Sequence, residues 1–104
     1  MRLATAVHCI RVYNVSTMKQ DLIGLRDHIN HLDEQLVLLL NERAKTALQI
    51  GEIKAAQGIK VYDPSRERAV IERVNSLNGG PLDKGALEEI YAAIIAVCRE
   101  IQSR

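Results

Sequence analysis

A long apolar repeat constrains the fold more than any other feature of this sequence. Between Leu22 and Ile53, apolar residues recur in alternating steps of three and four, and no proline interrupts the stretch. This spacing places one apolar face along an α-helix. We therefore expect a single helix from about Gln20 to Gln57, ended by Gly58.

The length of this expected helix indicates that the chain has a partner. At 1.5 Å per residue the helix would be ~55 Å long. A compact domain of 104 residues has a radius of gyration of only about 13 Å. One chain of this size cannot cover so long an apolar stripe. We expect a second copy of the chain to cover it in a two-fold dimer.

Two shorter helices are expected after the long one. Asp63 followed by Pro64 is typical of a helix start, with the aspartate as N-cap and the proline in the first turn. The breaker sequence NGGP at 78–81 should end this helix. A third amphipathic helix follows from about Asp83 to Gln102. No strand pattern is present, so the predicted fold class is all-α, with three helices.

Charge and composition exclude several kinds of partner. The chain has 14 Lys and Arg against 13 Asp and Glu, a formal charge of +1. So small a net charge favours neither nucleic acid nor an anionic membrane surface. No run approaches the ~20 apolar residues of a membrane span, and the N-terminus lacks a clear secretory signal. We expect a cytoplasmic protein, with residues 1–17 as a poorly ordered extension and 18–104 as one domain.

The sequence offers no metal, cofactor or nucleophile motif. Cys9 and Cys98 are far apart and lack a CxxC pattern, so neither a disulfide framework nor a zinc site is indicated. His28 and His31 have no matching third ligand. GxSxG, P-loop and GxGxxG motifs are also missing from the sequence. We therefore expect neither metal nor cofactor, and Cys98 is interpreted as a small core residue.

Arg43 interrupts the apolar repeat where a leucine would be expected. Removing a guanidinium from water costs several kcal/mol unless carboxylates or a ligand compensate. Arg43 could pair with a Glu or reach the helix periphery, or it could bind an anionic ligand, and its position alone leaves these alternatives open. Lys54 returns to nearly the same helix face about 16 Å further along. Arg26 lies ~25 Å before Arg43 along the helix, so it could share that ligand only from a partner chain.

Several motifs occur in order over residues 20–102: LxxLRxxI, LLNER, IGxxK, YDPxRE and a final Gln102. Together they closely resemble the all-helical (type II) chorismate mutase family. The resemblance implies an intertwined homodimer with two active sites. It also implies an isomerase that rearranges chorismate to prephenate in phenylalanine and tyrosine biosynthesis, with no cofactor or metal.

The resemblance also implies roles for the residues that grip the reacting part of the substrate. Arg26 would be donated in trans from the other chain, and Arg43 would bind a substrate carboxylate. Lys54 would contact the ether oxygen and a carboxylate. Gln102 would be the second donor to the ether oxygen.

Further roles follow from the same resemblance. Arg66 would form part of a cationic wall, and Glu67 would bind the ring hydroxyl. Asp63 would contribute contacts from the loop. Cys98 stands where many relatives carry Ser, and because a thiol is a weak donor we expect it only to line the pocket.

Two other functions stay open from the sequence. Isochorismate pyruvate lyase is a related helical protein that acts on a similar ligand, although the complete RE motif and the Arg43 and Lys54 face favour the mutase. The second is a non-catalytic helical dimerisation or regulatory module, in which the charged residues would serve only surface pairing.

Overall fold

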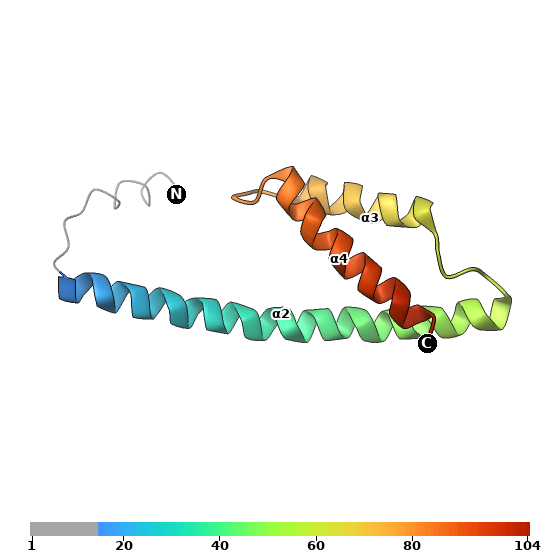
Figure 1. Ribbon diagram of the computed structural model, residues 1–104, viewed down its shortest axis with the longest axis horizontal. Coiled ribbons are helices and arrows are strands. Elements are labelled where there is room, and N and C mark those ends of the chain that lie inside the picture. The colour runs from blue at the N-terminus through green and yellow to red at the C-terminus, as the bar shows by residue number, and fades with distance from the viewer. Residues whose placement is uncertain (1–14) are drawn as a thin grey trace. The chain divides into compact units, whose positions relative to one another are not determined.

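The computed structural model describes the backbone of residues 15–104 and the side chains from Lys19 onward. Over this range the chain forms three helices and no strand: α2 (Val15–Gln57), α3 (Pro64–Leu77) and α4 (Lys84–Gln102) (Figure 1). The expected all-α class with one very long first helix is confirmed. None of the helices in this described range has a stretch hydrophobic enough for a membrane span.

The long helix begins at Val15 rather than at about Gln20. No glycine or proline stands between these two positions, so nothing in the sequence stops the helix from extending backward. Residues 15–17 of the expected N-terminal extension are therefore helical. The rest of that extension, with Cys9, lies outside the described residues.

The end of α2 is fixed by a glycine in the left-handed conformation. Gly58 has φ +67°, its N–H donates to the Ala55 carbonyl at 3.4 Å, and the Ile59 N–H donates to the Lys54 carbonyl at 2.8 Å. These two bonds form a Schellman motif, which satisfies carbonyls that the helix itself leaves unpaired. The expected end of the helix at Gln57 is confirmed, and Lys54 lies in its last turn.

Both shorter helices begin at an aspartate N-cap, which confirms the expected role of Asp63 and the expected start of the third helix near Asp83. The Asp63 side chain accepts a hydrogen bond from the Arg66 N–H at 3.0 Å. At the start of α4, the Asp83 side chain accepts from the Ala86 N–H at 2.8 Å. Each carboxylate satisfies one of the free N–H groups of a helix start, and its charge is favourable there.

A short loop after Leu77 joins α3 to α4. The Asn78 side chain donates to the Leu82 carbonyl at 2.8 Å and accepts from the Gly80 N–H at 2.9 Å. From this loop α4 leads away from α3, and its C-terminal end reaches the C-terminal part of α2 (Figure 1). As a result, α4 packs against α3 and its last turn lies against α2 at Gly51.

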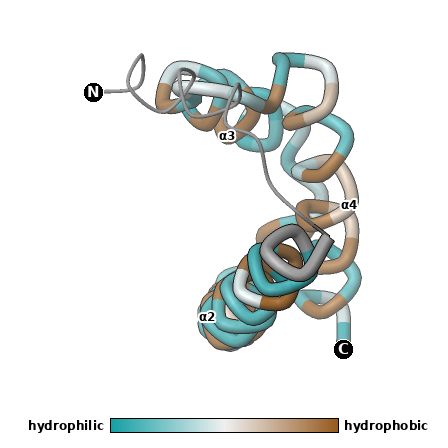
Figure 2. The backbone as a smooth tube through the Cα atoms, turned by 90° about the vertical axis from the view of Figure 1, so that its left-hand side faces the viewer, coloured by the Kyte–Doolittle hydropathy of each residue, from teal (hydrophilic) through white to brown (hydrophobic). Residues whose placement is uncertain are grey.

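The chain divides into two compact units, one ending at Leu38 and one beginning at Leu39. The second unit contains the C-terminal part of α2 together with α3 and α4. The buried hydrophobic side chains among the described residues are Ala47, Ile95 and Cys98, and all three belong to this unit. Hydrophobic and hydrophilic residues alternate along both α3 and α4 (Figure 2).

Many large apolar side chains of α2 are exposed among residues 19–57. Leu25 and Leu39 each expose 65% of their surface. The other large hydrophobic side chains exposed on this helix are Leu22, Ile23, Ile29, Leu32, Leu36, Val37, Leu38, Leu40, Leu48, Ile50 and Ile53. So many exposed apolar side chains on one helix favour an interaction site.

One glycine allows α4 to approach α2 closely. A Cβ atom added to Gly51 would lie 2.7 Å from the Gln102 carbonyl oxygen and 2.9 Å from the Gln102 Cα. Both are backbone atoms, which cannot rotate away as the end of a long side chain can. Gly51 is also buried. The glycine therefore determines how near the last turn of α4 can come to α2.

Replacing Gly51 with alanine should push these two helices apart. We expect Gly51→Ala to lower the free energy of unfolding by about 1–3 kcal/mol, the usual cost of overpacking, despite the better helix propensity of alanine. Urea unfolding at one fixed protein concentration measures this change. Gly85→Ala is the matched control, because the added Cβ would meet only the Asp83 side chain at 3.6 Å. A Gly51→Ala protein as stable as the wild type would contradict the close approach.

Candidate functional site

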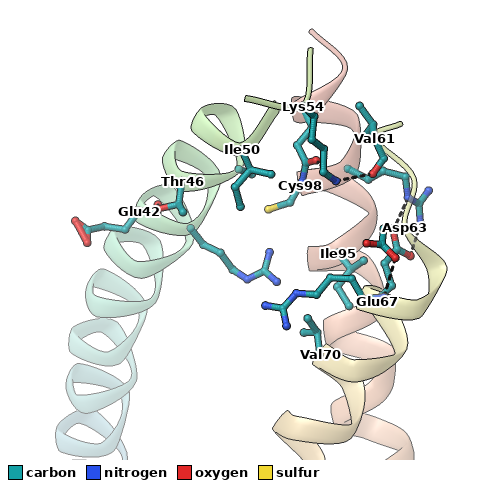
Figure 3. A pocket seen from close by; sticks show the side chains of 15 residues that line it. Glu42, Thr46, Ile50, Lys54, Val61, Asp63, Glu67, Val70, Ile95 and Cys98 are labelled. Atoms are coloured by element: carbon teal, nitrogen blue, oxygen red, sulfur yellow. Dashed lines mark hydrogen bonds and ion pairs between the residues drawn. The ribbon is translucent and has the colours of Figure 1, made fainter. Parts of the chain in front are cut away.

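A cavity of about 470 Å³ lies within the second unit, between the C-terminal part of α2, the start of α3 and the end of α4. Figure 3 shows the side chains that line it. They are Glu42, Arg43, Thr46, Ala47, Ile50, Lys54, Val61, Asp63, Arg66, Glu67, Val70, Ile95, Cys98, Arg99 and Gln102.

Most of the residues singled out from the sequence meet at this cavity. Those that line it are Arg43, Lys54, Asp63, Arg66, Glu67, Cys98 and Gln102. Arg26 is an exposed residue of α2 in the other compact unit and is not among the lining residues. A role for Arg26 therefore stays a prediction.

Arg43 is a half-buried cation of α2 at this cavity. The ion pairs among residues 19–104 join Arg99 to Glu67 and Arg104 to Glu100, so no carboxylate of this range pairs with Arg43. The carboxylate of its neighbour Glu42 is directed away from the other lining side chains in Figure 3. Within the described residues the charge of Arg43 is left for a ligand or for a partner chain.

Lys54 is held by two hydrogen bonds that link three parts of the unit. Its Nζ donates to the Val61 carbonyl at 2.9 Å and to Gln102 Oε1 at 3.1 Å. An ammonium group has three N–H donors, so one remains for a ligand. Because Gln102 accepts through its oxygen, its NH₂ group is also left to donate. Lys54 and Gln102 thus present two neighbouring donors in a fixed arrangement.

Asp63 and Arg66 lie at the start of α3. The Asp63 carboxylate caps the helix by accepting from the Arg66 backbone N–H, so its charge is directed to the helix start. The Arg66 guanidinium makes no hydrogen bond or ion pair within residues 19–104. It is therefore a second arginine at the cavity without a carboxylate partner.

Glu67 forms the one ion pair between lining residues of the cavity. Arg99 Nε donates to Glu67 Oε2 at 2.8 Å, and Arg99 Nη2 donates to Glu67 Oε1 at 3.0 Å. These hydrogen bonds from Arg99 are the main reason why the pKa of Glu67 lies below its ordinary value. The same pair raises the pKa of Arg99. Glu67 is therefore a carboxylate at neutral pH.

Arg99 is a charged lining residue that sequence reasoning missed. It follows Cys98 directly, but its partner Glu67 lies 32 positions earlier on another helix. No helical spacing connects two residues so far apart, and the family motifs include only Glu67. The only sequence signal for Arg99 was its position directly after Cys98, which was itself expected to line the pocket.

Apolar side chains form the remaining wall of the cavity. Ala47, Ile95 and Cys98 are its buried members, and Figure 3 shows the Cys98 sulfur directed toward α2. Cys98 is a free thiol. Residues 19–104 contain no group of three His, Cys, Asp or Glu side chains arranged to hold a metal ion.

The charges around the cavity suit a small anion with more than one negative group. Arg43, Lys54 and Arg66 are cations without carboxylate partners in the described part of the chain. Planar guanidinium groups bind carboxylates through paired, charge-assisted hydrogen bonds. The cavity can therefore bind a dicarboxylate and present the Lys54 and Gln102 donors to an oxygen outside its two carboxylates.

Known proteins with similar sequences carry chorismate mutase names. The bifunctional chorismate mutase/prephenate dehydratase of Aquifex aeolicus is 39% identical over 89 residues, which cover 82% of this chain and 25% of that protein. The corresponding protein of Neisseria gonorrhoeae is 36% identical over 86 residues, covering 83% and 23%. This chain thus spans about a quarter of the length of the curated relatives it matches.

Solved structures share the fold. The form II chorismate mutase of Thermus thermophilus superposes with a TM-score of 0.79 at 23% identity, covering 81% of this chain and 96% of that one. The chorismate mutase of Helicobacter pylori in complex with prephenate gives a TM-score of 0.74 at 31% identity, covering 81% and 91%. A family model described as chorismate mutase type II matches residues 25–103. The chain therefore belongs to the type II chorismate mutase family.

Proposed function

We propose that this chain is an isomerase that rearranges chorismate to prephenate. The observation that carries the proposal is the convergence of Arg43, Lys54, Arg66 and Gln102 on one cavity. Membership of the family and the likeness to a mutase solved with prephenate support it. We infer that the reaction serves phenylalanine and tyrosine biosynthesis in the cytoplasm.

The arginines would bind the two carboxylates of chorismate. Arg43 and Arg66 have guanidinium groups that no carboxylate of residues 19–104 neutralises. Bidentate bonds from such groups fix both the position and the orientation of a carboxylate. Holding the flexible side chain of the substrate over its ring lowers the entropic part of the barrier.

The reaction itself needs neither a nucleophile nor a cofactor, because it is a concerted intramolecular rearrangement. Its C–O bond breaks while a C–C bond forms, and negative charge develops on the ether oxygen. Lys54 and Gln102 would donate hydrogen bonds to this oxygen through the N–H groups that their mutual contact leaves free. Bonds that are stronger in the transition state than in the ground state accelerate the reaction.

The other predicted residues would bind the ring and shape the cavity. Glu67 would accept a hydrogen bond from the ring hydroxyl, since it is an ionised carboxylate with acceptor capacity beyond its bonds to Arg99. Asp63 would act mainly by capping α3, which fixes the backbone at Arg66. Cys98 would line the pocket as a buried thiol.

We also propose a homodimer in which each cavity is completed by Arg26 of the other chain. The exposed apolar residues of α2 support this assembly, because burying them against a second copy would remove a large apolar surface from water. Arg26 is exposed on the same helix. Delivered to a partner's cavity, it would add a third arginine for the dianionic substrate.

Arg43→Ala should impair catalysis without impairing assembly. We expect kcat/KM for chorismate to fall at least ~100-fold, comparable to the loss of one preorganised donor. An ultraviolet assay of chorismate consumption with product identification measures this, and size-exclusion chromatography checks the assembly. Lys45→Ala is the matched control, because Lys45 is exposed on the same helix and does not line the cavity. Activity of Arg43→Ala within threefold of wild type would remove Arg43 from the site.

The same assay separates the alternative functions. Release of pyruvate from isochorismate, with chorismate left unchanged, would identify a lyase instead of a mutase. A non-catalytic module would consume neither compound and would be indifferent to Lys54→Ala.

Gln102→Glu should make kcat increase as the pH falls. Beside the Lys54 ammonium the introduced carboxyl is ionised at neutral pH and has no proton to donate, so we expect kcat to fall roughly 10²- to 10³-fold. As the pH falls, the carboxyl gains a proton and can donate again, so activity should recover toward acid pH. A pH profile of kcat checks this. Gln102→Leu cannot recover, and equal profiles of the two variants would contradict the donor role.

Mixed dimers test whether Arg26 acts in trans. In a heterodimer of Arg26→Ala and Arg43→Ala chains, one cavity carries both lesions and the other carries neither. Random mixing makes half of the dimers heterodimers, so we expect about a quarter of wild-type activity to return. The activity of the mixture is compared with each mutant alone. If Arg26 acted within its own chain, every cavity would keep one lesion and the mixture would stay inactive.

A further inference from the structure

The contact between Arg99 and Glu67 has the geometry of a strong ion pair. Arg99 on α4 uses Nε and Nη2, and each nitrogen bonds a different oxygen of the Glu67 carboxylate on α3, at 2.8 and 3.0 Å. Two parallel bonds of this kind fix the plane of the carboxylate as well as its position. A single bond would leave the carboxylate free to rotate.

A second contact restrains the arginine itself. The guanidinium carbon of Arg99 lies 5.0 Å from the centre of the Tyr62 ring. A guanidinium at this distance over an aromatic face is attracted by the ring quadrupole. Tyr62 belongs to the loop before Asp63, so the loop, α3 and α4 together hold the guanidinium in one place.

The Arg99–Glu67 ion pair lines two cavities of the second unit. Glu67, Ile95 and Arg99 line both the cavity described above and a second one of about 630 Å³. The Glu67 side chain is 24% exposed and the Arg99 side chain 40%. Tyr62 lines only the second cavity. Glu67 is therefore the more enclosed partner, and Arg99 contacts a tyrosine of the second cavity, which Lys54 and Gln102 do not line.

We propose that Arg99, supported by Tyr62, is a positioning residue that holds the Glu67 carboxylate in place as the acceptor for the substrate's ring hydroxyl. This inference rests on the mutase function proposed above. It assigns to Arg99 an effect through Glu67 rather than a contact with the substrate. A carboxylate has about four lone-pair sites, so the two bonds from Arg99 leave acceptor sites open toward the cavity.

Among the groups around Glu67, Arg99 has the largest effect on its pKa. Burial and the nearby Asp63 carboxylate both raise the pKa of Glu67, whereas Arg99 lowers it most and Lys54 lowers it less. The titratable and charged groups that share a cavity with Glu67 are Glu42, Arg43 and Lys54 of α2, Tyr62 and Asp63 of the loop, Arg66, Arg68 and Glu72 of α3, and Lys84, Glu88, Cys98 and Arg99 of α4. Without Arg99, Glu67 should bind a proton at higher pH, and a protonated carboxyl is a weaker acceptor than a carboxylate.

The first test needs no substrate. The full chain, labelled with ¹³C at glutamate side-chain carboxyls, is titrated by NMR as the wild type and as Arg99→Leu. We expect the midpoint for Glu67 to move to higher pH in Arg99→Leu and to return toward the wild-type midpoint in Arg99→Lys, which keeps a cation. Arg104→Leu is the matched control, because it removes an exposed ion pair with Glu100 on the same segment and should leave Glu67 unchanged.

The second test measures catalysis in the same proteins. We expect Arg99→Leu to lower kcat/KM for chorismate at neutral pH by roughly 10- to 100-fold, the effect of a misplaced contacting group. The acid limb of the kcat/KM profile should also move to higher pH, and Arg99→Lys should reverse part of both changes. Tyr62→Leu changes an exposed residue and should move the acid limb to higher pH by a smaller amount. This variant tests the proposal even if Arg99→Leu does not fold.

The outcomes separate this inference from the proposed function. If the wild type does not rearrange chorismate, the mutase function fails, while the NMR titration still tests the pairing. An unchanged Glu67 midpoint in Arg99→Leu would overturn the positioning role. A loss of activity at every pH, with an unmoved acid limb and no rescue by lysine, would also overturn it, because Arg99 would then act through direct substrate contact or general stability.

Discussion

The close approach of α4 to α2 at Gly51 is the contact on which the rest of the cavity depends. It brings the last turn of α4 within reach of Lys54, so that the ammonium can bond both Gln102 and the Val61 carbonyl. These bonds connect residues 48 and 7 positions apart and fix the two donor groups relative to each other. A larger residue at this point would move the Gln102 backbone, and the donors would lose their common orientation. A glycine inside a helix lowers the stability of that helix relative to alanine. At position 51 the glycine allows the close contact with Gln102 that shapes the cavity.

The lining residues separate into charges that the protein itself satisfies and charges that it leaves open. The Asp63 carboxylate caps a helix and the Glu67 carboxylate binds Arg99. Arg43 and Arg66 receive no such partner within residues 19–104. Cations without partners repel one another and lose hydration in a cavity. A dianionic ligand removes both disadvantages, so its binding should also stabilise the folded chain by mass action.

Sequence reasoning succeeded where the governing interactions are local. The ends of the helices follow from Gly58, Asp63 and Asp83, whose effects act within one turn. The positions of Arg43 and Lys54 on one helix face follow from helical periodicity alone.

Other features depend on residues far apart in the chain and could not be predicted from local patterns. Glu67 and Gln102 were identified only through the family motifs. The importance of Gly51 appears only when Gln102 is placed beside it, and Arg99 matters only because Glu67 faces it from another helix. The start of α2 at Val15 was missed because the apolar repeat that predicted the helix begins only at Leu22.

The exposed apolar side chains of α2 and the proposed trans role of Arg26 would link assembly to catalysis. If the partner chain supplies Arg26, a monomer lacks one of the cations that bind the substrate. Association would then both bury the exposed apolar side chains of α2 and complete the cavity. Substrate would bind the dimer more tightly than the monomer, and by linkage it would favour association to the same extent. The apolar repeat would thus affect both the fold and the protein concentration above which the active dimer forms.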